Sequence, residues 1–283
     1  MTADISVASR VRAVRLPKPA VLLSAAALGL ILLAAVRPGL LAAGDPSGTD
    51  ALNALAPPDA AHPFGTDQLG RDVFTRVVHG ARYSLAIGAA ATGAGLAVAL
   101  VWGLASALSG RFGDAVLMRT ADALLALPGL LLALMVVLIA GKGVNGATIA
   151  VAAGIAPGFA RVVRAQALVV RRSGYVESAV ALGVRRPLIV LRHVLPNTVG
   201  PLLVVGTVTL GASISTGAAL SYLGLGAQPP TPEWGAMLTE GQGFLHLAWW
   251  IALFPGLMLV VTVVAVTVLG RHAQARSEGR YVS

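Results

Sequence analysis

The sequence has no cysteine among its 283 residues, and only 12% of them are charged. Without cysteine there can be no disulfide, no thiolate metal site and no cysteine nucleophile. An ordinary soluble domain carries about 25% charged residues, so this chain has about half the usual solubilising surface, while 56% of its residues are hydrophobic. This composition excludes a disordered protein and disfavours a soluble enzyme.

Charged residues are also missing from the interiors of six long apolar runs, each close to the roughly 20 residues that a helix needs to cross a bilayer. The runs cover residues 19–36, 83–110, 123–141, 143–160, 201–223 and 247–270. We expect each run to be a transmembrane helix. Ion-coupled carriers normally hold an ionisable residue inside a span, so the uncharged interiors predict a protein that does not energise transport itself.

The first run has an alternative interpretation. It follows a basic stretch with Arg10, Arg12, Arg15 and Lys18, and this order is also typical of a secretory signal peptide. The run is longer than the roughly 7–15 apolar residues of such a signal, and five more runs follow it. We therefore interpret it as a transmembrane helix, with a cleaved signal peptide as the alternative.

The distribution of basic residues predicts the orientation of the chain. If the N-terminus lies inside the cell, 16 of the 21 Lys and Arg residues fall on the inner side and 7 of the 12 acidic residues fall on the outer side. Inner loops of membrane proteins carry an excess of Lys and Arg, so we expect both termini to be cytoplasmic. The net charge of +9 is then a feature of the inner loops, and we expect no nucleic-acid partner.

The inner segment 161–197 contains seven basic residues and the turn signals of two short helices. Ser173 is expected to begin the first helix as its N-cap, and Gly183 to end it. Pro187 suits the first turn of a second helix, which we expect to end before Pro196 because proline is poorly tolerated inside a helix. Together the two helices predict a compact bracket on the cytoplasmic face. An amphipathic segment lying on anionic lipid is the alternative.

The bracket also carries a sequence pattern. Glu177, Ser178 and Ala179 are followed by Gly183 and by a closing Leu-Pro pair, and this pattern resembles the EAA loop in membrane subunits of bacterial ABC importers. Ser178 replaces the first alanine of that loop. The resemblance implies a coupling helix that docks in a groove of a cytoplasmic ATPase, within the segment 171–197. The implied ATPase-coupling residues are Glu177, Ser178, Ala179, Gly183, Arg185, Arg186, His193, Leu195 and Pro196.

Two outer stretches narrow the resemblance. Residues 62–85 and 220–235 resemble the second, C-type permease subunit of dipeptide, oligopeptide and nickel importers, and the similarity extends over 36–269. The residues of the outer family motif are His62, Pro63, Gly65, Thr66, Asp67, Gly70, Arg71 and Asp72. The resemblance implies that this outer region helps to receive a substrate-binding protein; a self-folded cap without a partner is the alternative.

The residues of the outer motif allow a partial physical account. Asp67, Arg71 and Asp72 are expected to form local ion pairs that fold the loop, each worth at most about 1 kcal/mol if exposed. Apolar residues recur at helical spacing over 73–81. This spacing predicts an amphipathic helix that lies along the outer membrane face before the second span.

Two smaller patterns predict positions in the membrane. Trp234, Trp249 and Trp250 lie in and beside the last outer segment, where tryptophans commonly anchor a protein at the membrane interface. Gly154 and Gly158 in the fourth run form a pair of small residues four apart, which predicts close packing against another helix. A gating hinge at this pair is the alternative.

No nucleotide or metal site is expected on this chain. The Gly141-Lys142 pair lacks both the earlier glycine and the following Ser or Thr of a phosphate-binding loop, and the five histidines are scattered along the chain. We therefore expect no cofactor here and no enzymatic activity, with ATP and Mg used by partner ATPase subunits. The resemblance implies a homologous second permease, one or two cytoplasmic ABC ATPases and an extracytoplasmic substrate-binding protein as partners, within a lipid bilayer.

The expected fold is an all-α integral membrane protein with about six transmembrane helices, both termini inside, and the type I ABC importer permease fold with its cytoplasmic coupling helix. The expected parts are a cytoplasmic tail (1–18), transmembrane helix 1 (19–36), an extracytoplasmic segment (37–82), a permease core with helices 2–6 (83–270) and a cytoplasmic tail (271–283). The resemblance implies a multi-pass protein of the bacterial cytoplasmic membrane that forms half of a pathway for di- or oligopeptides. A nickel-chelate or other small-solute permease is the alternative, and a self-sufficient secondary transporter is a more distant one.

Overall fold

The computed structural model describes residues 19–277, and its regular structure is helical. The expected tail 1–18 and the end of the expected tail 271–283 lie outside the described residues. The helices are α1 (Pro19–Val36), α2 (Val73–Leu108), α3 (Arg111–Leu125), α4 (Gly129–Ala140), α5 (Val144–Arg171), α6 (Gly174–Ala181), α7 (Arg186–Ile189), α8 (Leu195–Tyr222), α9 (Trp234–Gln242) and α10 (Trp250–Ser277). A π-helical turn, Val190–Val194, joins α7 to α8, and two 3₁₀ turns, Pro38–Leu40 and Ala51–Asn53, lie between α1 and α2.

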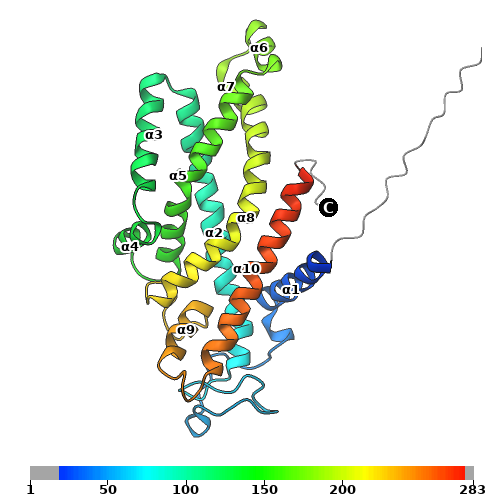
Figure 1. The fold of residues 1–283 in the computed structure, drawn as a ribbon, viewed down its shortest axis with the longest axis vertical. Helices are drawn as coiled ribbons and strands as arrows, with labels where there is room; N and C mark the ends of the chain where they lie inside the picture. The colour runs from blue at the N-terminus through cyan, green and yellow to red at the C-terminus, as the bar shows by residue number, and fades with distance from the viewer. Residues whose placement is uncertain (1–18, 278–283) are drawn as a thin grey trace, which may run out of the picture.

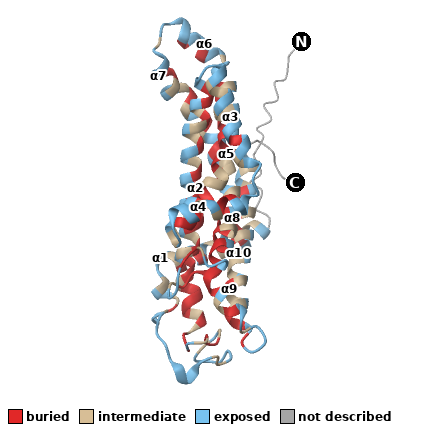
Figure 2. Cartoon of the chain, turned by 90° about the vertical axis from the view of Figure 1, so that its left-hand side faces the viewer, coloured by how far each residue is buried: buried red, intermediate tan, exposed pale blue. Residues whose placement is uncertain are grey.

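The bundle is built around α2, which has 36 residues and packs along α5 and α8. Helix α10 packs on α8 and α9, and α1 packs on α10 and α2. Figure 1 shows α6 and α7 at one end of the bundle and α9 with the 37–72 segment at the opposite end. Figure 2 shows the buried residues along the shared centre of these helices, while the two ends are more exposed.

Glycines on α2 allow its close contacts. A side chain at Gly95 would approach Ile155 of α5 to 2.5 Å, and one at Gly103 would approach the carbonyl oxygen of Ala160 to 2.5 Å. Small residues are the usual means by which membrane helices approach each other. The prediction that Gly154 and Gly158 form such a contact is wrong within this chain, because a side chain at either position would meet nothing within 4 Å.

Five helical stretches are long and apolar enough to cross a bilayer, and α3 with α4 forms a sixth candidate as a broken pair bent by 101°. The expected straight span 123–141 is therefore wrong. Helix α4 has 12 residues, about 18 Å, against a hydrocarbon core of about 30 Å. The break falls at Pro128, because the residue before a proline is disfavoured in helical conformation and α3 has already ended at Leu125.

The expected second short helix does not end before Pro196. Residues Arg186–Tyr222 form one continuous helical stretch. Its π-helical turn moves the hydrogen bond of the Leu195 amide back five residues, to the carbonyl of Val190. The widened turn makes room for the ring of Pro196, which follows it directly in α8.

The expected amphipathic helix over 73–81 is also not separate, because these residues form the first turns of α2. Val73, Val77 and Ala81 are buried, and they pack in one cluster with Trp234 and other residues of the outer end. Packing against the protein thus replaces the expected contact with the membrane surface.

Two of the three tryptophans are not the interfacial anchors that we expected. Trp234 and Trp250 are buried, and their indole N–H groups donate to the carbonyls of Val77 (2.9 Å) and Thr66 (3.0 Å). Trp249 is 50% exposed. Both buried tryptophans fasten the outer segments to the bundle.

Candidate functional site

The outer motif folds around a buried cluster of four charges. Arg71 donates from Nε to Asp67 Oδ2 at 2.6 Å and from Nη2 to Glu240 Oε2 at 2.7 Å. Arg76 donates to the same two oxygens, at 3.2 and 2.9 Å. Asp67, Arg71 and Arg76 are buried, and Glu240 belongs to α9. The predicted pairing of Asp67 with Arg71 is confirmed, but it is neither exposed nor purely local. We call these four residues the outer charge cluster.

Two glycines of the motif are required by backbone geometry. Gly70 has a φ of +72°, and a side chain there would lie 1.7 Å from the carbonyl oxygen of Asp50. Gly65 has a φ of +70°, and a side chain there would lie 2.6 Å from the indole nitrogen of Trp250. Positive φ favours glycine because it has no Cβ. The glycines let residues 37–72, which we call the outer cap, close tightly on the bundle.

Asp72 does not pair with Arg71 as expected. It is the N-cap of α2, where its Oδ2 accepts from the Thr75 amide at 2.8 Å and from the Thr75 hydroxyl at 2.6 Å. Its Oδ1 lies 3.1 Å from Nδ1 of His62. A carboxylate at this position satisfies one of the free amides at the helix start and interacts favourably with the helix dipole.

The remaining residues of the outer motif serve the fold in different ways. Thr66 is buried, and its hydroxyl accepts from the Ala56 amide at 2.8 Å and donates to the Asn53 carbonyl. Pro63 is exposed. The structure therefore brings most of the motif together as a folded cap.

Sequence reasoning missed the acidic residues that join α9 to the outer cap and to α2. Besides Glu240, these include Glu233, which is buried before α9. Its Oε1 accepts from the Ser84 hydroxyl at 2.8 Å, and its Oε2 accepts from the Ala236 amide at 3.0 Å. Two acidic residues in a segment rich in proline and glycine were a visible signal. The spacing along the chain gave no indication of their distant partners.

The bracket at the opposite end has the expected start and stop. Ser173 occupies the N-cap position of α6, although its hydroxyl donates to the Val170 carbonyl at 2.5 Å instead of capping the helix. Gly183 has a φ of +76° just after α6. The Val184 amide donates back to the Ala179 carbonyl at 3.1 Å, which is the bond of a glycine-terminated helix end. The expected glycine stop is confirmed.

One face of α6 packs on the bundle. Val176 and Ala179 are buried together with Ile189 and Val194 of the returning segment and with Ala167 of α5. Ala179, which the resemblance placed among the docking residues, thus points its methyl group inward and sets the position of α6.

The opposite face of α6 is open. Leu182 is 83% exposed, Val180 59% and Tyr175 48%. Glu177 and Ser178 are exposed beside them. An exposed apolar patch at a helix end, rimmed by polar residues, is typical of a protein contact. Leu182 and Val180 were not among the residues singled out from the sequence.

The other expected coupling residues differ in their exposure. Arg185, Arg186 and Pro196 are exposed, and His193 and Leu195 are half-buried. The described structure thus leaves both arginines accessible to a partner.

Ion pairs tie the helices that carry the bracket. Arg164 of α5 donates from Nε and Nη2 to the Asp114 carboxylate of α3, each at 2.5 Å. Arg171, at the end of α5, donates to the Ala107 carbonyl of α2. These contacts hold α2, α3 and α5 together where α6 packs.

The helical bundle is similar to the fold of solved ABC transporter structures. Solved structures share this fold. One, described as inward-facing conformations of the MetNI methionine ABC transporter, covers 71% of this chain and 95% of its own, with a TM-score of 0.56 at 21% identity. Another, described as an amino acid ABC transporter with histidines, covers 71% of this chain and 94% of its own, with a TM-score of 0.54 at 14% identity.

Residues 83–279 match the family of binding-protein-dependent transport system inner membrane components, and the chain belongs to this family. Two relatives are named glutathione transport system permease protein GsiD. The protein from Escherichia coli O6:K15:H31 is 46% identical over 75% of this chain and 70% of its own length, and that from Pectobacterium atrosepticum is 43% identical over 75% and 71%.

These findings confirm the resemblance drawn from the bracket and the outer motif. The protein is a multi-pass inner-membrane permease of an ABC importer and is not itself an enzyme. As a binding-protein-dependent component it works with an ATPase and a substrate-binding protein.

Proposed function

We propose that this permease forms half of the pathway for short peptides, of about the size of glutathione, and that a homologous second permease forms the other half. The relatives named glutathione permeases support a tripeptide-sized substrate. They favour a peptide over a nickel chelate. The chain itself binds no cofactor in this proposal, and ATP and Mg act on one or two kinds of separate ATPase subunit.

The observation that carries the coupling role is the open face of α6. Val180 of α6 and its C-cap residue Leu182 are exposed, while the other face of α6 packs against α2 and α5. Burying an exposed valine or leucine side chain against a partner contributes about 1.5–3 kcal/mol. In this proposal Leu182 enters a groove of the ATPase, with Glu177 beside it on the exposed face.

Coupling then follows as a shift between conformations. Closing of the ATPase dimer on ATP moves the bracket as a rigid body, and the attached helices tilt from inward-open to outward-open. Such a shift requires that the ATP-bound ATPase prefer one permease state by several kcal/mol, about 5.5 kcal/mol for a change from 1:99 to 99:1.

The test uses the complete importer reconstituted in liposomes, with Leu182→Asp and Glu177→Arg in this chain. Both variants should insert in the membrane normally but lose glutathione uptake and substrate-stimulated ATP hydrolysis. The matched control is Phe112→Asp, because Phe112 is also 83% exposed and lies at the start of α3, outside the bracket. Normal coupling in both bracket variants would overturn the docking role, and failure of the wild-type importer to take up short peptides would overturn the substrate.

A further inference from the structure

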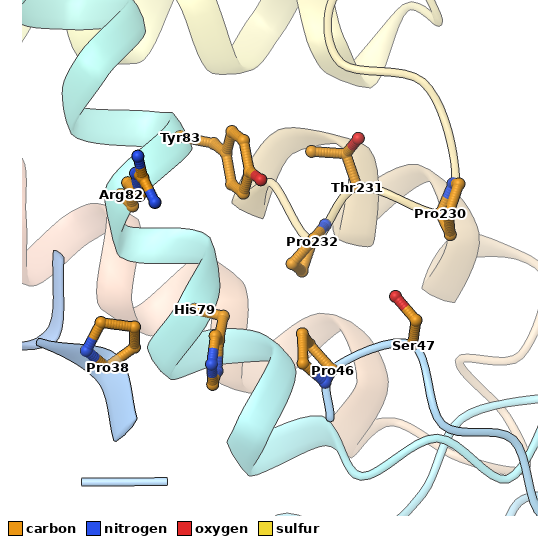
Figure 3. Close-up of a pocket in the computed structure, with 9 residues that line it drawn as sticks. All are labelled: Pro38, Pro46, Ser47, His79, Arg82, Tyr83, Pro230, Thr231 and Pro232. Atoms are coloured by element: carbon orange, nitrogen blue, oxygen red, sulfur yellow. The ribbon is translucent and has the colours of Figure 1, made fainter. Parts of the chain in front are cut away.

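A hollow of about 250 Å³ opens at the outer end of the bundle, between the outer cap, α2 and the segment before α9 (Figure 3). Prolines form much of its wall: Pro38 and Pro46 on the cap side, and Pro230 and Pro232 on the side of α9. Proline has a fixed φ, so these walls lose little freedom when a ligand binds. Such preorganisation favours affinity.

Helix α2 contributes the polar groups of one wall. His79, Arg82 and Tyr83 are three and four residues apart and therefore share a helix face. Figure 3 shows the hydroxyl of Tyr83 directed across the hollow toward Thr231. Ser47 lies on the wall formed by the cap. The side-chain hydroxyls of Ser47, Tyr83 and Thr231 have no hydrogen-bond partner within the described part of the chain, so they are free to bind a ligand.

Arg82 is the cation of the hollow, and no acidic residue within 19–277 pairs with it. It is exposed, whereas Arg71 and Arg76 are buried in the outer charge cluster. The acidic residues of the outer segments are engaged elsewhere. Each accepts hydrogen bonds from a backbone amide, a nearby side chain or one of the two buried arginines. These acidic residues are Asp45, Asp50, Asp59, Asp67, Asp72, Glu233 and Glu240. The charge of Arg82 is thus available to an anion from outside the chain.

His79 supplies a hydrogen-bond acceptor beside the cationic Arg82. Its Nδ1 lies 2.9 Å from the Thr75 carbonyl oxygen, which can only accept, so Nδ1 carries the proton. In the neutral ring Nε2 is then a hydrogen-bond acceptor. One wall therefore presents a cation for a carboxylate and an acceptor for an N–H group.

We propose that this hollow is a binding site for the carboxyl end of a short peptide at the outer mouth of the permease. Arg82 binds the terminal carboxylate, with the hydroxyl of Tyr83 as a second donor, and His79 Nε2 accepts from a peptide N–H. A hollow of this volume and concave shape suits the end of a small molecule better than a broad protein contact. The inference rests on the proposed peptide function and names where this chain meets the peptide.

The test measures binding of trialanine and of trialanine amide to the full chain in lipid nanodiscs, by ligand-observed NMR titration. Trialanine should bind saturably, and the amide should bind at least about tenfold more weakly because it lacks the carboxylate. Arg82→Gln should weaken trialanine binding by a similar factor, and Arg82→Lys should restore part of it. Lys142→Gln is the matched control, because Lys142 is an exposed cation that does not line the hollow.

Each contrary result overturns the site. Equal binding of trialanine and its amide would mean that no carboxylate is recognised, and an unchanged affinity in Arg82→Gln would place the peptide elsewhere. Weaker stimulation by the binding protein in Arg82→Gln, with trialanine binding unchanged, would assign Arg82 to protein docking instead. Peptide uptake by the wild-type importer is measured in parallel. Uptake without binding at the hollow rejects this site and leaves the proposed function standing, whereas absence of uptake rejects that function.

Discussion

Arg76 of α2 and Glu240 of α9 lie 164 residues apart in the sequence, and their side chains meet at 2.9 Å in the interior of the outer end. The same Glu240 oxygen also accepts from Arg71. One carboxylate thus joins the outer cap, the start of α2 and α9. Removal of one member of a buried ion pair is costly because it leaves the other charge without compensation.

Glu240→Ala should therefore destabilise the outer end by about 3–5 kcal/mol, since both arginines would lose a partner. We expect a lower melting temperature of the purified protein and faster proteolysis within the outer cap. Asp45→Ala is the control, because Asp45 is exposed and its carboxylate accepts from the nearby Ser47 amide. Equal melting temperatures for the two variants would contradict a stabilising role for the cluster.

Gly70→Ala should disturb the cap more than its size suggests. The new methyl group would overlap the carbonyl of Asp50 at 1.7 Å, and the positive φ adds about 1–3 kcal/mol of strain. Thermal unfolding and limited proteolysis measure the effect. Gly39→Ala should be close to neutral, because a side chain there meets nothing within 4 Å; similar losses in both variants would show that the turn is not the cause.

Gly183→Ala tests the end of α6 without a steric clash, because a side chain there has open space. The left-handed conformation should cost about 1 kcal/mol, which frays the last turn of α6. Hydrogen exchange of α6 should quicken and coupled ATP hydrolysis should fall. In Gly174→Ala, at the start of the same helix, the backbone conformation is not strained and both readouts should stay normal. Gly183→Asn should be better tolerated than Gly183→Ala, since asparagine adopts this conformation more readily.

Gly103→Ala and Gly158→Ala separate two glycines that look alike in the sequence. The first would drive a methyl group to 2.5 Å from the Ala160 carbonyl and force α2 away from α5, whereas the second meets nothing within 4 Å among residues 19–277. We expect a clear loss of thermal stability in the isolated chain for Gly103→Ala only. The reverse order of stability would contradict the packing of α2 on α5.

Local signals in the sequence predicted local structure well. The first apolar run matches α1, and the glycine after α6 ends that helix as its type predicts. The errors arose at prolines, where the effect of the ring on the helix depends on the neighbouring residues. Pro128 breaks an apolar run that is long enough to span a bilayer, whereas Pro196 does not break a helix, because the π-helical turn before it accommodates the ring.

The outer site was harder to predict because its contacts are distant in the sequence. Asp67 and Arg71 are four residues apart and could be paired by inspection, but Glu240 could not be assigned to them by spacing. Trp234 is buried because segments distant in the sequence pack around it. From its residue type and its place in the chain alone, we expected it at the membrane interface. The pattern of the bracket identified the correct family, while the exposure of Leu182 required the folded chain.

The continuous helical stretch Arg186–Tyr222 connects the bracket with α9. Its 37 residues follow a helical path of about 55 Å that contains a π-helical turn and Pro201 and runs from the bracket to α9. There the carbonyl of Tyr222 accepts from the hydroxyl of Thr239 at 2.7 Å, and the next residue is Glu240 of the outer charge cluster. A single helical backbone, which includes the π-helical turn, therefore connects the bracket with a residue next to the outer charge cluster.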